Sequence, residues 1–271
     1  MDVIIQKDAE AVSELGASLI AELVSIKPNC VLGLATGSTP LHIYQRLVKI
    51  YESGQLSFRD VITFNLDEYI GLEPDHPQSY RSYMSREIFS KVDIEAANTY
   101  LPTVGAQQNP RLVGAAYEEK IKSAGGIDLQ ILGIGRNGHI GFNEPGSSLS
   151  SRTRIKTLTQ STVADNGRLF VPEEFQPQLA MTMGIRSILD ARRVILFATG
   201  EQKANAIRLA VEGPLTASCP ASSLQMHERA TFILDEAAAS ELEGAAYFRW
   251  SHHHNSPLID RYGFFHELSD S

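Results

Sequence analysis

The chain has 271 residues, 43% of them hydrophobic, and a formal net charge of −8. This length suits one large domain or two small ones, with enough apolar residues for an ordinary core. The acidic balance argues against a nucleic-acid partner, and every apolar run is far shorter than the roughly 18 residues that a membrane span needs. The start MDVIIQKDAE lacks the pattern of a signal peptide. Two unpatterned cysteines, Cys30 and Cys219, suit a reducing cytoplasm.

Apolar runs alternate with helical patterns along the chain. A first core helix is expected around Ala11–Leu23, and further helical patterns cover 41–51, 111–123 and 202–213. Five strands are expected at 31–35, 61–66, 127–134, 194–199 and 231–234. Short apolar strands separated by such helices predict an open, mostly parallel α/β sheet with helices on both faces. No repeat or linker divides the chain, so we expect a single domain over 1–271, with a lid-like excursion around 143–192 where the strand signal is weak.

Four polar motifs follow four of the expected strands. They read TGSTP at 36–40, NLDEY at 65–69, GIGRNGHIGFNEP at 133–145 and ATGEQK at 198–203. In open α/β sheets ligands bind at the carboxyl ends of the strands, so these motifs are expected to line one crevice.

The first two motifs predict an anion site and a carboxylate base. Gly37, Ser38 and Thr39 offer a tight turn, hydroxyls and the N–H groups of a helix start, which together suit an anion. An ordinary capped strand–helix junction is the alternative, and without a following lysine the motif is no Walker A loop. In NLDEY we choose Asp67 over Glu68, because neighbouring side chains on a strand point to opposite sides.

The third motif contains G-x-G-x-x-G at 133–138, as a dinucleotide site would. Gly141 and Pro145 interrupt the helix that such a site needs, and the expected ribose-binding acid is missing around 153–158. We therefore interpret the stretch as a glycine-rich turn that presents His139 and Glu144 for acid–base chemistry. A hydrogen-bonded structural histidine is the competing interpretation.

Positive charge for an anionic ligand is available from Lys203, from Arg168 and from a basic cluster at 152–156, although each side chain is equally suited to a solvated surface. The histidines at 252–254 are adjacent and do not converge on one ion, so we expect surface or interface residues there and no metal site.

Taken together, ATGSTP, TFNLDEYIGL, GIGRNGHIGFNEPGSS, SRTRIKTL and TGEQKA, in this order, resemble the glucosamine-6-phosphate deaminase family over about residues 1–240. The resemblance implies a Rossmann-like open sheet without a nucleotide or other cofactor. It implies an enzyme of amino-sugar catabolism that converts glucosamine 6-phosphate and water to fructose 6-phosphate and ammonia by isomerisation and deamination.

The resemblance also implies a role for each motif. His139 would open the sugar ring. Glu144 would orient the His139 imidazole and balance its charge, and Asp67 would move a proton from C2 to C1 of the sugar. Some members carry aspartate where this chain has Asn137, which holds the histidine by a hydrogen bond but brings no negative charge. The substrate phosphate would bind Gly37, Ser38, Thr39, Arg168 and Lys203.

Assembly and regulation stay open. Allosteric members of the family are hexamers that bind N-acetylglucosamine 6-phosphate between subunits, through a segment that here supplies Ser147, Ser148, Arg154 and Lys156. The tail after about residue 245 does not match those members, and other relatives are monomeric and unregulated.

Three alternatives accompany this interpretation. A 6-phosphogluconolactonase shares the fold but needs no C2 base, so the NLDEY segment disfavours it. A galactosamine-6-phosphate isomerase differs only by the C4 epimer of its substrate. A non-catalytic sugar-phosphate sensor would carry a DNA-binding helix-turn-helix, for which we see neither room nor basic surface.

Overall fold

The computed structural model describes residues 1–271 except 106, 168–169, 172–173 and 266–271. Its main element is a seven-stranded sheet in the order β1-β10-β9-β6-β2-β3-β5, and all the strand pairs in it are parallel. The strands are β1 (Asp2–Gln6), β2 (Val31–Leu34), β3 (Ile62–Asn65), β5 (Thr99–Tyr100), β6 (Leu129–Leu132), β9 (Arg193–Ala198) and β10 (Ala230–Asp235).

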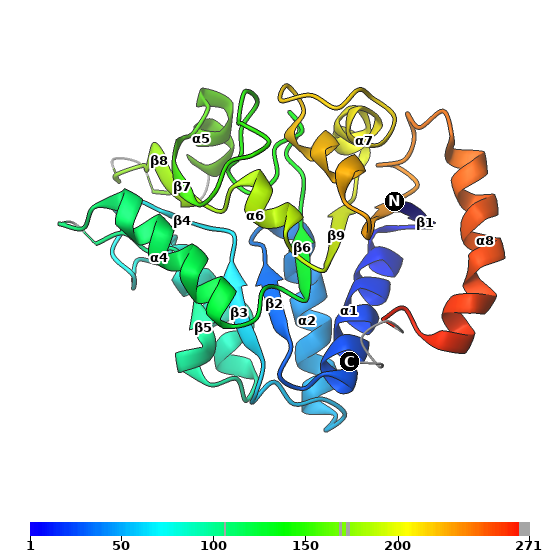
Figure 1. Cartoon of the computed structure of the whole chain (residues 1–271), viewed down its shortest axis with the longest axis horizontal. Coiled ribbons are helices and arrows are strands. Elements are labelled where there is room, and N and C mark those ends of the chain that lie inside the picture. Colours follow the sequence, from blue (N-terminus) through cyan, green and yellow to red (C-terminus); the bar gives the residue numbers. More distant parts are fainter. Residues whose placement is uncertain (106, 168–169, 172–173, 266–271) are drawn as a thin grey trace.

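Helices cover both faces of this sheet, as the sequence predicts (Figure 1). The α-helices are α1 (Ala9–Ile26), α2 (Ser38–Glu52), α3 (Tyr80–Glu87), α4 (Pro110–Ser123), α5 (Gln160–Gly167), α6 (Ile185–Leu189), α7 (Ala204–Val211) and α8 (Ala245–Tyr262). Short 3₁₀ segments in the described part of the chain are η1 (Phe89–Lys91), η2 (Ala96–Asn98), η3 (Glu201–Lys203) and η4 (Pro220–Met226). α1 and α2 pack together on one face, because Gly16 of α1 leaves room for Ile43 of α2 and Phe197 of β9. α4 packs on β3, where the Tyr117 ring meets the edge of Phe64.

The segment expected as a lid-like excursion builds a second, smaller sheet. Two of its parts, β7 (Arg154–Thr157) and β8 (Leu179–Thr182), pair antiparallel with each other, and β8 pairs with β4 (Asp67–Tyr69), which follows β3. A small apolar cluster that includes Tyr69, Phe142 and Leu158 forms a core there, apart from the large core of the parallel sheet. Local signal for this sheet is weak because β4 carries two acids and β7 carries two basic residues, so neither strand is a continuous apolar run.

The topology brings the four polar motifs together. From β2 the chain runs outward through β3 to β5, and α4 then returns it to β6 on the other side of β2. The sheet order therefore reverses between β2 and β6, which is the position where such folds form a crevice for ligands. β9, β6, β2 and β3 are consecutive neighbours, so the loops after them meet at one edge.

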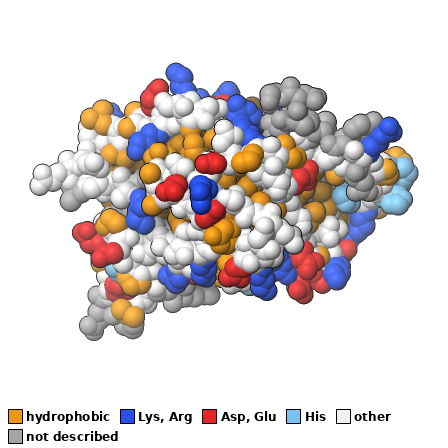
Figure 2. All heavy atoms as spheres, turned by 90° about the horizontal axis from the view of Figure 1, so that it is seen from below, with side chains coloured by type: hydrophobic (Ala, Val, Ile, Leu, Met, Phe, Trp, Pro, Cys, Tyr) orange, Lys and Arg blue, Asp and Glu red, His pale blue; other side chains and the backbone are white. Residues whose placement is uncertain are grey.

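The face opposite these loops carries the mixed charges that are typical of a water-exposed surface. Figure 2 shows positive and negative side chains intermixed there, with histidines at the end that carries α8. His253 and His254 of α8 are exposed, as expected for surface residues. Among the described residues, none of the helices combines the length and the apolar character that crossing a membrane requires.

Candidate active site

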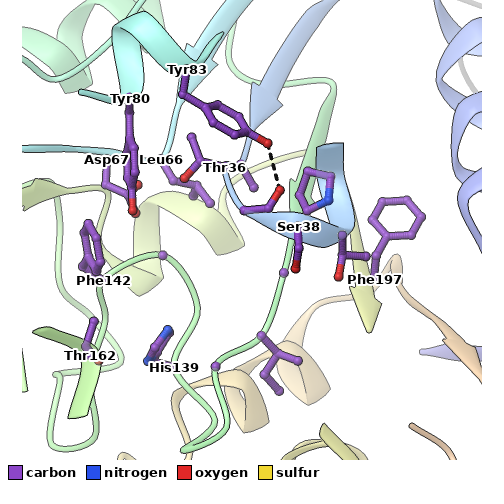
Figure 3. Close-up of a pocket in the computed structure, with 18 of the residues that line it drawn as sticks. Thr36, Ser38, Leu66, Asp67, Tyr80, Tyr83, His139, Phe142, Thr162 and Phe197 are labelled. Carbon is purple, nitrogen blue, oxygen red and sulfur yellow. Dashed lines mark hydrogen bonds between the residues drawn. The ribbon is translucent and has the colours of Figure 1, made fainter. Parts of the chain in front are cut away.

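A cavity of about 660 Å³ opens at the carboxyl ends of β2, β3, β6 and β9. It is lined by residues from all four motifs, and Figure 3 shows Asp67, His139 and Ser38 around the same space. The volume falls in the range of ordinary small-molecule sites. The four loops therefore form one site, as the positions of the motifs predict.

Asp67 and Glu68 occupy opposite sides of β4. Asp67 is only 5% exposed and lines the cavity. Glu68 is also buried, but its carboxylate accepts hydrogen bonds from the backbone N–H groups of Tyr80 and Arg81 at 2.9 Å each, and from Tyr69. The Glu68 carboxylate therefore pairs with the N–H groups at the start of α3, while Asp67 is the acid that faces the cavity.

The surroundings of Asp67 favour its protonated form. Burial is the main cause, and the nearby Glu68 carboxylate adds to it, so that the pKa of Asp67 rises to about 8 against a usual value of 3.8. The backbone N–H of Phe142 opposes this shift by bonding the carboxylate. A carboxyl group with such a pKa holds and releases a proton near neutral pH, as proton transfer during catalysis requires.

His139 is paired with a second carboxylate that stays ionised. Its Nδ1 lies 3.3 Å from Oε2 of Glu144, which also accepts a 2.8 Å hydrogen bond from Nδ2 of Asn137. Oε1 of Glu144 accepts a 2.5 Å hydrogen bond from the Thr162 hydroxyl. Burial alone would raise the pKa of Glu144, but the His139 ring and these hydrogen bonds lower it to about 2. Glu144 is therefore a negative partner for the imidazole.

The glycines of this loop make room for the side chains of His139 and Asp67. A Cβ on Gly135 would lie 2.3 Å from Cε1 of His139, so any larger residue displaces the ring. Gly141 has a φ of +53°, and a Cβ there would be 3.1 Å from Oδ2 of Asp67. The loop thus brings its backbone against both His139 and Asp67.

The opposite end of the cavity suits an anion. Gly37 precedes α2, and Ser38 and Thr39 form its first turn, whose N–H groups carry the partial positive charge of a helix start. Lys203 lines the same cavity and donates a 2.7 Å hydrogen bond to the carbonyl of Ile134. Arg136 also lines it, whereas Arg168 lies outside the described residues.

An aromatic wall joins the two ends, and sequence reasoning missed it. Tyr80 stacks on Phe142 with ring centres 5.9 Å apart, and Tyr69 packs against both rings. All three line the cavity, together with Phe170 and Thr162 from the second sheet's segment. Phe142 lies within the GHIGFNEP motif and was open to prediction, whereas Tyr80 and Thr162 come from stretches without a motif.

Comparison with known proteins agrees with this geometry. A family model described as glucosamine-6-phosphate isomerases/6-phosphogluconolactonase matches residues 6–233. The chain belongs to this family. A curated relative, the glucosamine-6-phosphate deaminase of Colwellia psychrerythraea, is 57% identical over 266 residues, which are 98% of this chain and 99% of the relative. The deaminase of Cellvibrio japonicus is 53% identical over 264 residues, 97% of this chain and 100% of the relative.

Solved structures of the family agree with the fold. A monomeric glucosamine-6-phosphate deaminase matches with a TM-score of 0.85 and 41% identity, covering 89% of this chain and 100% of its own. The 6-phosphogluconolactonase of Trypanosoma cruzi matches with a TM-score of 0.68 over 89% of this chain and 97% of its own, but with 21% identity, so it supports the fold alone.

The residues that the family resemblance links to regulation lie outside the cavity wall. Ser147 is buried, whereas Ser148 is exposed with its Oγ 3.1 Å from that of Ser150. Arg154 and Lys156 are half-buried on β7, and Arg154 donates a 2.9 Å hydrogen bond to Oδ1 of Asn143. An effector site made of these four residues stays a prediction.

Proposed function

We propose that the protein is a glucosamine-6-phosphate deaminase that converts glucosamine 6-phosphate and water to fructose 6-phosphate and ammonia. The observation that carries this proposal is the shared cavity of Asp67 and His139, two acid–base groups from different motifs, with an anion site at its other end. Isomerisation of a cyclic phosphosugar needs just this combination of two proton-transfer groups and a phosphate anchor.

In the first stage the pyranose ring opens. His139 removes the proton of the anomeric hydroxyl and returns a proton to the ring oxygen as the bond between C1 and that oxygen breaks. The ionised Glu144 balances the charge of the protonated imidazole and fixes its orientation, with Asn137 and Thr162 holding Glu144 in turn.

In the second stage Asp67 moves the C2 proton of the open-chain sugar. Its carboxylate takes this proton to form an enolamine and delivers a proton to C1, which leaves an iminium at C2. Water adds to that carbon, and ammonia leaves to give the ketone of fructose 6-phosphate. The ammonium group at C2 of the substrate favours the ionised form of Asp67, because a positive charge within about 4–6 Å typically lowers a carboxyl pKa by about 1–3 units.

The phosphate is held at the start of α2, by the backbone of Gly37, Ser38 and Thr39, with Lys203 as a cationic partner and Arg168 as a second one. A charge-assisted hydrogen bond of this kind contributes roughly 1.5–3 kcal/mol. Anchoring the phosphate fixes the distance of C1 and C2 from Asp67, which is worth more to the rate than binding alone.

The nearest competing activity is that of a 6-phosphogluconolactonase. Ester hydrolysis would give the buried carboxyl of Asp67 no proton to transfer at C2, and the 6-phosphogluconolactonase structures share only 18–21% identity with this chain. The deaminase relatives are 50–57% identical over nearly the whole length. Galactosamine 6-phosphate, the C4 epimer, is the other substrate to compare.

The decisive experiment measures ammonia and fructose 6-phosphate from glucosamine 6-phosphate, beside lactone hydrolysis and the galactosamine epimer. We expect ammonia from the glucosamine substrate, and loss of C2-proton exchange in Asp67→Asn with binding retained. Lactone hydrolysis without ammonia release would overturn the proposal.

The partner is thus a small phosphosugar, and the mechanism uses only side chains of this chain. Cytoplasmic localisation is part of the proposal, supported by Cys30 and Cys219 being buried thiols. Of the two assembly states considered, hexamer and monomer, the 41% identity to a monomeric deaminase favours the monomer.

A further inference from the structure

Asn143 is a fully buried amide, 0% exposed, within the loop that carries His139 and Glu144. Its Nδ2 donates to the carbonyl of Ile140 at 3.0 Å and to that of Met183 at 2.8 Å. Its Oδ1 accepts the 2.9 Å hydrogen bond from Nη1 of Arg154. Both donor positions and the acceptor of the amide are thus in use, and they reach three different segments.

The short turn closed by Asn143 lies between the two proposed catalytic groups. His139 immediately precedes the turn at 140–143, and Glu144 immediately follows it. Within the turn, Gly141 lies so close to Asp67 that a Cβ on it would be 3.1 Å from Oδ2 of that carboxylate. The N–H of Phe142 donates a 3.1 Å hydrogen bond to the Thr182 hydroxyl. A shift of this turn would therefore move the His139–Glu144 pair relative to Asp67.

The second sheet supplies the frame for this turn. Thr182 of β8 is the register partner of Asp67 on β4 and of Arg154 on β7. Met183, whose carbonyl accepts from Asn143, follows directly, and its N–H donates to the carbonyl of Leu66 at 2.7 Å. Asp67, Thr182 and Arg154 thus form one row across the three strands, and Met183 directly follows that row.

We propose that Asn143, held by Arg154, is a positioning residue that sets the geometry of the His139–Glu144 pair relative to Asp67. This inference rests on the proposed function and adds to it a residue behind the cavity wall that acts through its neighbours. Proton transfer is sensitive to displacements of well under 1 Å, so loosening of the turn lowers turnover more than substrate binding. The proposal also assigns Arg154 a positioning role in the reaction itself, separate from effector binding.

The first test compares Asn143→Ala, Asn143→Asp and Arg154→Met with wild type. Asn143→Asp keeps the size and the acceptor but cannot donate to the two carbonyls. For all three variants we expect kcat to fall about ten- to hundredfold with KM changed less than about threefold. Arg152→Met is the matched control, because Arg152 pairs with Glu118 and Asp190 instead, and it should retain kcat.

The second test separates positioning from general stability through double-mutant cycles. If Asn143 acts through the histidine, Asn143→Ala should change kcat less than about twofold in a His139→Gln background, and Asn143→Ala with Arg154→Met should cost little more than either change alone. Thermal unfolding and substrate binding monitor folding. Should Asn143→Ala fail to fold, the Arg154→Met cycle with His139→Gln decides in its place.

The outcomes are distinct. Wild-type protein that releases no ammonia contradicts the proposed function. Active wild-type protein with kcat preserved in folded Asn143→Ala or Arg154→Met, or with a full and independent loss of kcat in the His139→Gln background, overturns the positioning role.

Discussion

Asp67 and Glu68 are adjacent residues of β4 whose buried carboxyl groups lie on opposite sides of the strand. Asp67 faces the cavity, and the Glu68 carboxylate accepts hydrogen bonds from the backbone N–H groups at the start of α3. The neighbour of the proposed base thus holds a cavity wall in place and adds negative charge beside that base.

Asp67→Asn should abolish turnover and stabilise the fold at neutral pH. The pKa of Asp67 is about 8 in the folded protein against a usual 3.8, so folding takes up a proton between these values and stability falls as pH rises from about 4 to about 8. The variant removes this loss and should gain on the order of a few kcal/mol at pH 8 and nothing at pH 4. Chemical unfolding at pH 4, 6 and 8 measures it, with the exposed Asp75→Asn as control. A gain of equal size at every pH would contradict the raised pKa.

Glu68→Gln should move the acidic limb of the pH–rate profile. Because the base must be ionised to take the C2 proton, kcat/KM of wild type is expected to rise with pH toward the Asp67 pKa of about 8. Removing the Glu68 charge lowers that pKa, so the rise should begin at lower pH. The amide also weakens the bonds to α3, which lowers the melting temperature. An unmoved limb with a lower melting temperature would leave Glu68 only its capping role.

Gly135→Ala should impair turnover through His139. The added Cβ would lie 2.3 Å from Cε1 of the ring, so the imidazole has to leave its contact with Glu144. We expect kcat to fall about ten- to hundredfold, as for other displaced catalytic groups. Gly105→Ala, in an exposed loop, is a suitable control. Wild-type kcat in a folded Gly135→Ala protein would show that the ring position is not critical.

Asn137→Asp should shift the pH–rate profile upward. The Asn137 amide donates to Glu144 at 2.8 Å, and an aspartate there replaces this donor by a second negative charge near His139. Added negative charge favours a protonated imidazole, so the step that needs the neutral ring requires higher pH. Steady-state rates across pH 5–10 for both proteins test this, and superimposable profiles would refute it.

The parallel sheet was predictable because its central strands are almost continuously apolar. The runs at 31–35, 61–66, 127–134, 194–199 and 231–234 correspond to β2, β3, β6, β9 and β10, which are buried except for the half-buried first residues of β3 and β9. β1 and β5 lie at the edges, where β1 begins with an exposed residue and β5 spans two residues. Edge strands of this kind depend on pairing with a neighbour, which local sequence does not reveal.

The same contrast applies to the site. Asp67, His139 and Glu144 were predictable because Asp67 follows an apolar strand beside a second acid, and the other two follow an apolar strand in a glycine-rich turn. Tyr80 reaches the cavity only because Glu68 anchors the start of α3, and Thr162 only because α5 folds back over the loop. These placements depend on contacts between segments far apart in the chain, so no local sequence pattern predicts them.

The C-terminal helix has a consequence for the behaviour of the chain in concentrated solution. β1 is the outer strand of the parallel sheet, and α8 lies beside it (Figure 1). A bare outer strand offers unsatisfied peptide groups to any other chain that arrives with a complementary strand. Because α8 lies along this edge strand, it hinders pairing of β1 with a strand of another molecule. This role is separate from the chemistry at the carboxyl ends of the strands.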